Sequence, residues 1–187
     1  MMFPETEITG SVLLIICELP QTIIGVGYSK LNIIIHDVDK ISYYDGATYV
    51  INKTGKTSGT TGSTLGSFIN ITTDESIPMY KGKLIPYAHP VYAHEYGHYL
   101  QSKSSGPAYL FKYGIPSVVD FYKNKGKQVN YLDRNGQLLS IEKHHIHSAE
   151  IDANQRAAQY FSENHVLNYN NNGWNYENSH PTYAIVL

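Results

Sequence analysis

The sequence predicts an α+β fold, because short apolar segments dominate its first 75 residues and helical patterns dominate the rest. Leu31–Ile35 (LNIII) is a β-branched run typical of a buried strand, and Thr48–Ile51 (TYVI) is a second short strand. Leu65–Thr72 alternates apolar and polar residues, as a half-buried strand does. We therefore expect a small, mostly antiparallel sheet packed against helices, with a cleft between the sheet edge and the helices.

Polar stretches between these segments are typical of loops. His36–Asp45 and Asp74–Pro90 show no strand or helix pattern, and Asp74–Pro90 contains three prolines. Lys53–Ser63 is rich in Gly, Ser, Thr and Lys, which favours a flexible loop or a hairpin tip. These segments are predicted to connect the elements of the fold.

The second half of the chain carries the helical patterns. A helix is expected from near Val91 through Ser102, and Ala108–Phe121 is a second apolar element, predicted to be buried and broken at Gly114–Pro116. Ser148–Glu163 gives the strongest helix signal, with Ser148 as its N-cap. Its predicted apolar face consists of Ile151, Ala158 and Phe161.

The remaining segments are hydrophilic. Tyr122–Lys143 is a predicted insertion, and Asp133–Gly136 within it has the composition of a β-hairpin tip. Asn164–Leu187 is rich in Asn and Tyr and is expected to be irregular. The length suits one compact domain, so we expect residues 1–187 to form a single domain with the insertion at 122–143.

Composition excludes several classes of site. The net charge of the 187-residue chain is -2 and no basic stripe is present, which argues against nucleic acid as a partner. Cys17 is the only cysteine, so neither an intrachain disulfide nor a cysteine-based zinc site can form. Nine histidines are available, and any zinc site must be built from histidine and carboxylate.

The N-terminal region is apolar without forming an ordinary membrane span. Ser11–Gly27 is interrupted by Glu18 and Pro20, and its two apolar halves are too short to cross a bilayer. Met1–Gly10 is acidic, so no signal peptide is evident. A buried helix or strand pair broken at Leu19–Pro20 is expected, with a membrane-surface or re-entrant element as the alternative.

The chemistry is concentrated in His94-Glu95-Tyr96-Gly97-His98, an HExxH pattern. On a helix, residues four apart share a face, so His94 and His98 can present two imidazole nitrogens to one Zn²⁺. Glu95 points about 100° around the helix from His94, within reach of a water on the metal. Zinc would lower the pKa of that water towards ~7, and Glu95 would act as general base. The alternative is a surface helix that carries these residues by chance.

A catalytic zinc also needs a third protein ligand and one open position. Glu150 is the leading candidate because a carboxylate on the second helix can face the first one. Asn154 lies one turn later and could accept a hydrogen bond from a ligand histidine. The competing ligands are His147, His144, His145 and Asp152.

Three stretches resemble known proteins. His94–Ser102 (HEYGHYLQS), with a separate helix carrying E-x-x-x-[DN], is similar to the gluzincin group of zinc peptidases, which includes thermolysin. Together with Gly106–Ser117 and Ala149–Phe161, it resembles a group of small bacterial HExxH metallopeptidase-like proteins. The resemblance spans most of the chain from Glu18 to Phe161.

The resemblance implies a zincin-like domain over residues 1–187, with one Zn²⁺ held by His94, His98 and Glu150. It also implies Glu95 as the base, Asn154 as the partner of a ligand, and a peptide or protein as substrate. Asn154 stands where thermolysin-like enzymes have Asp, and the 122–143 insertion is longer than expected. Because no signal peptide is evident, the bacterial cytoplasm or a membrane surface is the favoured compartment.

The sequence supports two hypotheses of function. The first is a zinc-dependent peptidase, with Leu65–Thr72 as the edge strand that pairs with extended substrate. The second is a zinc-containing binding or structural module without turnover, with a membrane surface as one location. In this hypothesis a fourth protein ligand such as His147 closes the site. Residue type alone offers four donors to stabilise an oxyanion, with none preferred: Tyr160, His165, His180 and Tyr183.

Overall fold

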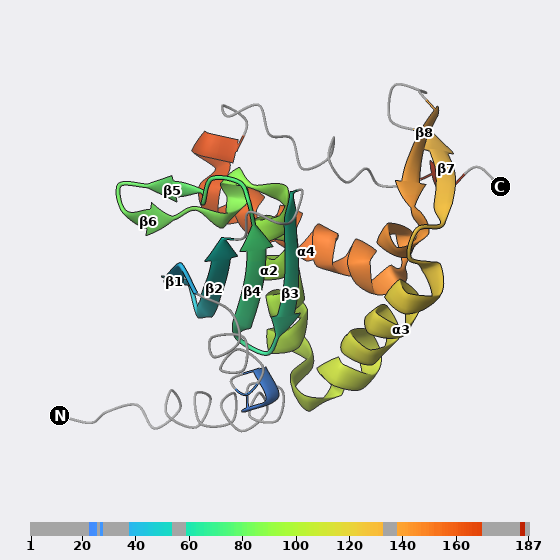
Figure 1. Cartoon of the computed structure of the whole chain (residues 1–187), viewed down its shortest axis with the longest axis horizontal. Coiled ribbons are helices and arrows are strands. Elements are labelled where there is room, and N and C mark those ends of the chain that lie inside the picture. The colour runs from blue at the N-terminus through green and yellow to red at the C-terminus, as the bar shows by residue number, and fades with distance from the viewer. Residues whose placement is uncertain are drawn as a thin grey trace.

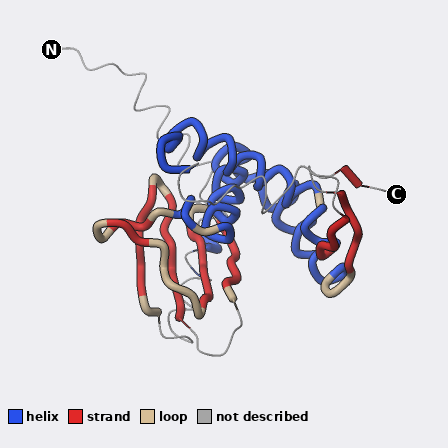
Figure 2. Tube along the Cα trace, turned by 90° about the horizontal axis from the view of Figure 1, so that it is seen from above, coloured by secondary structure: helices blue, strands red, loops and turns tan. Residues whose placement is uncertain are grey.

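In the computed structural model, a small sheet lies against two crossing helices, with a third helix and a hairpin at the far side (Figures 1 and 2). The structure describes residues 23–25, 27, 38–53, 59–132, 138–169 and 184–185. Helices α2 (Pro90–Ser105) and α4 (Ser148–Tyr169) cover one face of the sheet. The α+β class predicted from the sequence is confirmed.

The main sheet has four strands in the order β1-β2-β4-β3. They are β1 (Lys40–Tyr44), β2 (Ala47–Lys53), β3 (Thr60–Leu65) and β4 (Phe68–Thr73). The β1–β2 and β3–β4 pairs are antiparallel, whereas β2 and β4 are parallel. The sheet is therefore mixed, and β3 is its edge strand on one side.

One strand prediction and two loop predictions in this region need correction. The predicted strand at Thr48–Ile51 is present within β2, but the predicted loop His36–Asp45 contains β1. Leu65–Thr72 is two strands, because Gly66 and Ser67 form the turn between β3 and β4. The loop predicted at Lys53–Ser63 includes the start of β3. Leu31–Ile35 and most of Ser11–Gly27 lie outside the described residues.

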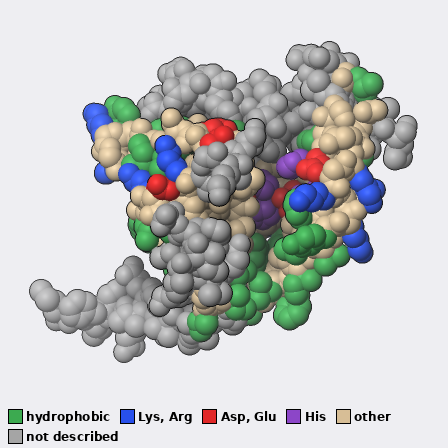
Figure 3. Space-filling model, in the orientation of Figure 1, with side chains coloured by type: hydrophobic (Ala, Val, Ile, Leu, Met, Phe, Trp, Pro, Cys, Tyr) green, Lys and Arg blue, Asp and Glu red, His purple; other side chains and the backbone are tan. Residues whose placement is uncertain are grey.

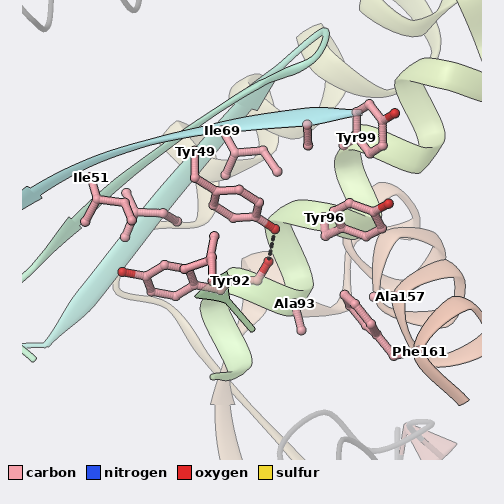
Figure 4. Close-up of a cluster of buried hydrophobic side chains, with 12 residues drawn as sticks. Tyr49, Ile51, Ile69, Tyr92, Ala93, Tyr96, Tyr99, Ala157 and Phe161 are labelled. Atoms are coloured by element: carbon pink, nitrogen blue, oxygen red, sulfur yellow. Dashed lines mark hydrogen bonds between the residues drawn. The ribbon is translucent and has the colours of Figure 1, made fainter. Parts of the chain in front are cut away.

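The core lies between the sheet and the two helices (Figure 4). Alternate residues of the two central strands point at the helices, because side chains alternate between the two faces of a sheet. Tyr49 stacks on Tyr92 and donates a hydrogen bond of 3.1 Å to the Tyr92 carbonyl oxygen. The fully buried members of this core are Ala47, Tyr49, Ile51, Ile69, Ile71, Tyr92, Ala93, Tyr96, Ala157 and Phe161.

Helix α2 begins and ends where local chemistry requires. His89 is its N-cap, where Nδ1 accepts from the Val91 amide, and Pro90 occupies the first turn, where its missing N–H costs nothing. The helix ends at Gly106, whose positive φ of 53° suits glycine. The expected helix from Val91 to Ser102 is thus present and three residues longer at its C-terminal end.

Helix α4 is capped differently from the expectation. His147 rather than Ser148 caps it, since His147 Nδ1 accepts from the Ala149 amide at 3.3 Å. Its buried face repeats every four residues and consists of small side chains followed by one large one: Ala149, Ala153, Ala157 and Phe161. Small residues allow a close approach of a second helix.

That approach is closest at Gly97. A methyl group at position 97 would lie 2.6 Å from the carbonyl carbon of Ala153, and closer still to its oxygen. No side chain fits there without moving a backbone. Gly97 therefore sets the distance between the helix that carries the two histidines and the helix that carries Glu150.

The segment after α2 is helical and partly exposed. It runs through η2 (Gly106–Ala108) and a π-helical turn, η3 (Leu110–Gly114), into α3 (Ile115–Asn124). Only Tyr109 and Tyr113 of this segment are buried. The prediction of a buried element is therefore wrong, whereas the predicted break at Gly114–Pro116 coincides with the boundary between η3 and α3.

The 122–143 region and the C-terminal part contain strands. β7 (Gln128–Leu132) and β8 (Leu138–Glu142) form the predicted hairpin, whose tip lies outside the described residues. β9 (Ala184–Ile185) pairs with β7, and α4 extends to Tyr169. The prediction of an irregular segment from Asn164 onwards is therefore wrong at the end of α4 and at β9.

A short hairpin and a single helical turn link the sheet to α2. β5 (Met79–Tyr80) pairs with β6 (Lys83–Leu84), and η1 (Pro86–Ala88) leads into the helix. The expected loop at Asp74–Pro90 thus has some regular structure. Within the part of the chain that the structure describes, no helix is long and apolar enough to cross a membrane.

Replacing Gly97 with alanine is expected to destabilise the protein by about 2 kcal/mol. Alanine gains about 1 kcal/mol of helix propensity over glycine, but overpacking against a backbone costs more, at the upper end of about 1–3 kcal/mol. Urea unfolding measures the difference. Gly27→Ala is the matched control, because nothing lies within 4 Å of a methyl group there. Equal stability of Gly97→Ala and the control would contradict the close-packing argument.

Candidate metal centre

Helices α2 and α4 bring three ligand-type side chains to one point. His94 Nε2 lies 3.1 Å and His98 Nε2 lies 3.2 Å from Oε2 of Glu150. The three ligand atoms lie within 4.8 Å of one another, and all three side chains are largely buried. Figure 3 shows histidine side chains, with acidic groups beside them, in a hollow between the sheet side and the α3 side of the molecule.

Each histidine is oriented through its other ring nitrogen. His98 Nδ1 lies 2.8 Å from Oε1 of Gln101, and His94 Nδ1 lies 2.6 Å from Oδ1 of Asn154. An amide oxygen only accepts, so each Nδ1 carries a hydrogen, and each ring in its neutral form presents the lone pair of Nε2. The hydrogen bond expected between Asn154 and a ligand histidine is present. Both rings thus have the tautomer that suits a cation at Nε2.

Gln101 also ties the centre to the backbone of α4. Its Nε2 donates to the Ala149 carbonyl oxygen at 2.7 Å and to Asp152 Oδ2 at 2.8 Å. These two acceptors fix the orientation of the amide, so its oxygen must face His98. Asp152 itself pairs with Arg156 at 2.7 Å and is not one of the three converging groups.

Glu150 is held by its second oxygen. Ser117 of α3 donates to Oε1 at 2.5 Å, while Oε2 faces the two histidines. His144 Nε2 lies 3.6 Å from the same Oε1, and His144 Nδ1 lies 3.0 Å from Asp120 Oδ2. The carboxylate is therefore positioned to offer one oxygen to a ligand and the other to the protein.

The other candidate ligands do not join the three converging atoms. His147 caps α4, and His144 contacts Oε1 of Glu150 rather than the oxygen that faces the histidine pair. His145 follows His144 in the chain. Burial is the main cause that lowers the pKa of His145, and the nearby His94 and His144 lower it further. Among the described residues, no fourth His, Cys, Asp or Glu joins the group.

Glu95 lies against the edge strand β3. Thr64 Oγ1 of β3 donates to Glu95 Oε2 at 2.6 Å, and the carboxylate is buried. A methyl group at Gly62 would lie 2.7 Å from the Glu95 carboxyl carbon. The space that Glu95 occupies therefore exists because residue 62 is glycine.

The charges of the centre are strongly coupled. Burial alone would lower the pKa of His98, but the charge and hydrogen bond of Glu150 outweigh it and raise the pKa to about 9. Burial would raise the pKa of Glu150, but His98 and His94 lower it far below its usual range. A buried carboxylate of this kind needs a positive partner, which is either a protonated imidazole or a cation.

The donor set fits zinc. Two imidazole nitrogens and one carboxylate oxygen are the ligands of a common type of catalytic zinc site. Their outer hydrogen bonds to Gln101, Asn154 and Ser117 are of the kind that orient metal ligands. Three protein donors leave one position of a tetrahedral ion for another molecule.

The oxyanion donors considered from the sequence are not brought to the centre by any described contact. Tyr160 donates to Asp45 Oδ2 and packs on Tyr96. The side chains of His165, His180 and Tyr183 lie outside the described residues.

Four residues that support this centre are absent from the sequence-based prediction. Gln101 was detectable, because it lies three residues after His98 on the same helical face. Ser117, Asp120 and Thr64 reach the centre from other elements, and no spacing in the sequence connects them with it.

Comparison with protein-family models, curated proteins and solved structures finds no match to this chain.

Replacing Gln101 with alanine is expected to weaken zinc binding by about 10–100-fold, because His98 loses the acceptor that fixes its tautomer. Competition with a fluorescent chelator measures the affinity. Gln155→Ala, at an exposed position of α4, serves as the matched control. Unchanged affinity in Gln101→Ala, with the control also unchanged, would show that Gln101 does not orient a metal ligand.

Proposed function

We propose that this protein is a zinc-dependent hydrolase, most specifically a peptidase, with His94, His98 and Glu150 as the zinc ligands. The observation that carries the proposal is the convergence of two Nε2 atoms and one carboxylate oxygen from separate helices. A buried carboxylate, that of Glu95, lies next to this group on the same helix as the histidines. A carboxylate next to three metal ligands favours a site that activates water over a purely structural site.

Each residue has a defined task in this proposal. Bound zinc would supply Lewis acidity, which lowers the pKa of water and polarises a carbonyl oxygen. Glu95 accepts the proton from water at its carboxylate and delivers it to the leaving amine. Thr64 holds one oxygen of that carboxylate and leaves the other for proton transfer.

Substrate would bind along β3 in an extended conformation. β3 is the edge of the sheet, its residues Thr61–Ser63 are exposed, and its neighbour Thr64 contacts Glu95. Adding a strand to such an edge places a peptide bond beside the centre. The prediction of an edge strand at Leu65–Thr72 is wrong, because most of this range belongs to β4, which is an inner strand paired on both sides. With β3 in this role, we propose a zincin-like arrangement.

The non-catalytic alternative required a fourth protein ligand, with His147 as the expected residue. His147 accepts a hydrogen bond from the backbone at the start of α4 instead. This favours an open coordination position and therefore the hydrolase.

Glu95→Gln is expected to reduce peptide hydrolysis by about 10²–10⁴-fold while zinc stays bound, because the amide cannot accept the proton. Metal content follows from mass spectrometry of the purified protein. Cleavage is followed as new N-termini released from a mixture of unstructured peptides. Glu75→Gln, an exposed carboxylate in the loop after β4, is the control. A zinc-loaded wild-type protein with no cleavage above the metal-free protein would support the non-catalytic module and overturn the peptidase.

Gly62→Ala is expected to reduce kcat by about tenfold or more with unchanged zinc content, because the new methyl group displaces the Glu95 carboxylate and misplaced catalytic groups lose rate steeply. Ser63→Ala, at the next exposed position of β3, controls for a general effect on the strand. The comparison is steady-state kinetics of the two zinc-loaded variants. A Gly62→Ala enzyme with full kcat would show that Glu95 is not held against β3 during turnover.

A further inference from the structure

Helix α3 and the turn before it present an apolar face to solvent. Five large hydrophobic side chains lie at intervals of four, three, one and three residues, which places them on one side of a helix. Their exposed fractions range from 43% to 77%. We refer to them as the α3 apolar face: Phe111, Ile115, Val118, Val119 and Tyr122. Figure 3 shows hydrophobic side chains gathered over this part of the molecule.

The opposite side of the same helix is polar and faces the protein. Ser117 donates to Glu150, Asp120 pairs with His144, and Asn124 donates to Asp120 at 2.6 Å. A helix on the surface of a soluble domain normally has the reverse arrangement, with its apolar stripe on the core. An exposed apolar surface of this extent marks an interaction site.

Lysines border the α3 apolar face. Lys112 and Lys123 each follow one of its aromatic residues directly, and Lys125 and Lys127 follow the helix end; all four are exposed. Residues 101–127 contain five lysines and one carboxylate, Asp120, in a chain whose net charge is -2. That carboxylate is engaged with His144 and Asn124 on the inner side. The face is therefore apolar at its centre and positive at its margin.

We propose that the α3 apolar face docks the protein on a membrane surface that contains anionic lipids. An amphipathic helix with aromatic and aliphatic residues on one side and lysines at the margin lies in the interface, with its lysines at the headgroups. Lysine is depleted in protein–protein interfaces, so four of them around the face favour lipid over a protein partner. The proposal is independent of the proposed hydrolase, although Ser117 places α3 directly against Glu150.

Flotation with vesicles tests this proposal on the full chain. Vesicles of phosphatidylcholine alone are compared with vesicles that also contain phosphatidylglycerol, at low and high salt. We expect binding to the anionic vesicles that weakens with salt. Val118→Ser with Tyr122→Ser is expected to reduce the partition coefficient by about tenfold or more, because two apolar side chains no longer insert. Ile41→Ser with Tyr43→Ser removes a β-branched aliphatic residue and a tyrosine from the exposed side of β1 and is expected to have no effect.

A second pair of variants tests the charged margin without changing the apolar side chains. Lys112→Glu with Lys123→Glu is expected to weaken binding to anionic vesicles by about tenfold or more. Lys81→Glu with Lys83→Glu is the matched control near the β5–β6 turn, and circular dichroism checks that each variant is folded. Absence of wild-type binding to anionic vesicles, or equal losses in test and control variants, overturns the proposal. The proposal is also overturned if the wild-type protein is a dimer without lipid and the double variant Val118→Ser with Tyr122→Ser is a monomer, because the face is then a contact between two copies of the chain.

Discussion

The close packing of α2 on α4 at Gly97 is the constraint on which the centre depends. A backbone carbonyl of α4 occupies the space that a side chain at position 97 would need. Because the helices come this close, the carboxylate of Glu150 on α4 can reach two imidazoles on α2. The alanines of α4 that face α2 serve the same approach, so packing and ligand geometry have a common cause.

Burial of Glu150 imposes a second condition. A carboxylate removed from water is unfavourable unless charge and hydrogen bonds compensate, and here two imidazoles and Ser117 do so. Gln101 and Asn154 then restrict each imidazole to one tautomer. The hydrogen bonds around the three donors thus orient them and at the same time satisfy buried polar groups that would otherwise destabilise the fold.

Helix α3 connects this centre with the surface. Its inner side supplies Ser117 and the Asp120–His144 pair, so the helix must turn its polar residues inwards. The apolar residues are then left facing solvent. The exposed α3 apolar face is therefore coupled to the way in which the helix supports Glu150, and the proposed lipid contact uses the side that the centre does not need.

Local spacing along the chain was enough to predict part of the centre and part of the fold. His94 and His98 share a helical face because they are four residues apart, and Glu150 and Asn154 share one for the same reason. The turn residues at 133–136 likewise predicted the β7–β8 hairpin. These features depend on neighbouring residues alone, so the sequence by itself determined them.

Only the tertiary structure decided which strands pair, that Leu65–Thr72 divides at Gly66, and that the apolar residues of α3 are exposed. Strand partners and burial depend on segments that are distant in the sequence. The same holds for Ser117 and Thr64, which reach the centre from other elements of the fold. No local pattern carries that information, because each of these contacts exists only once the helices and the sheet have packed together.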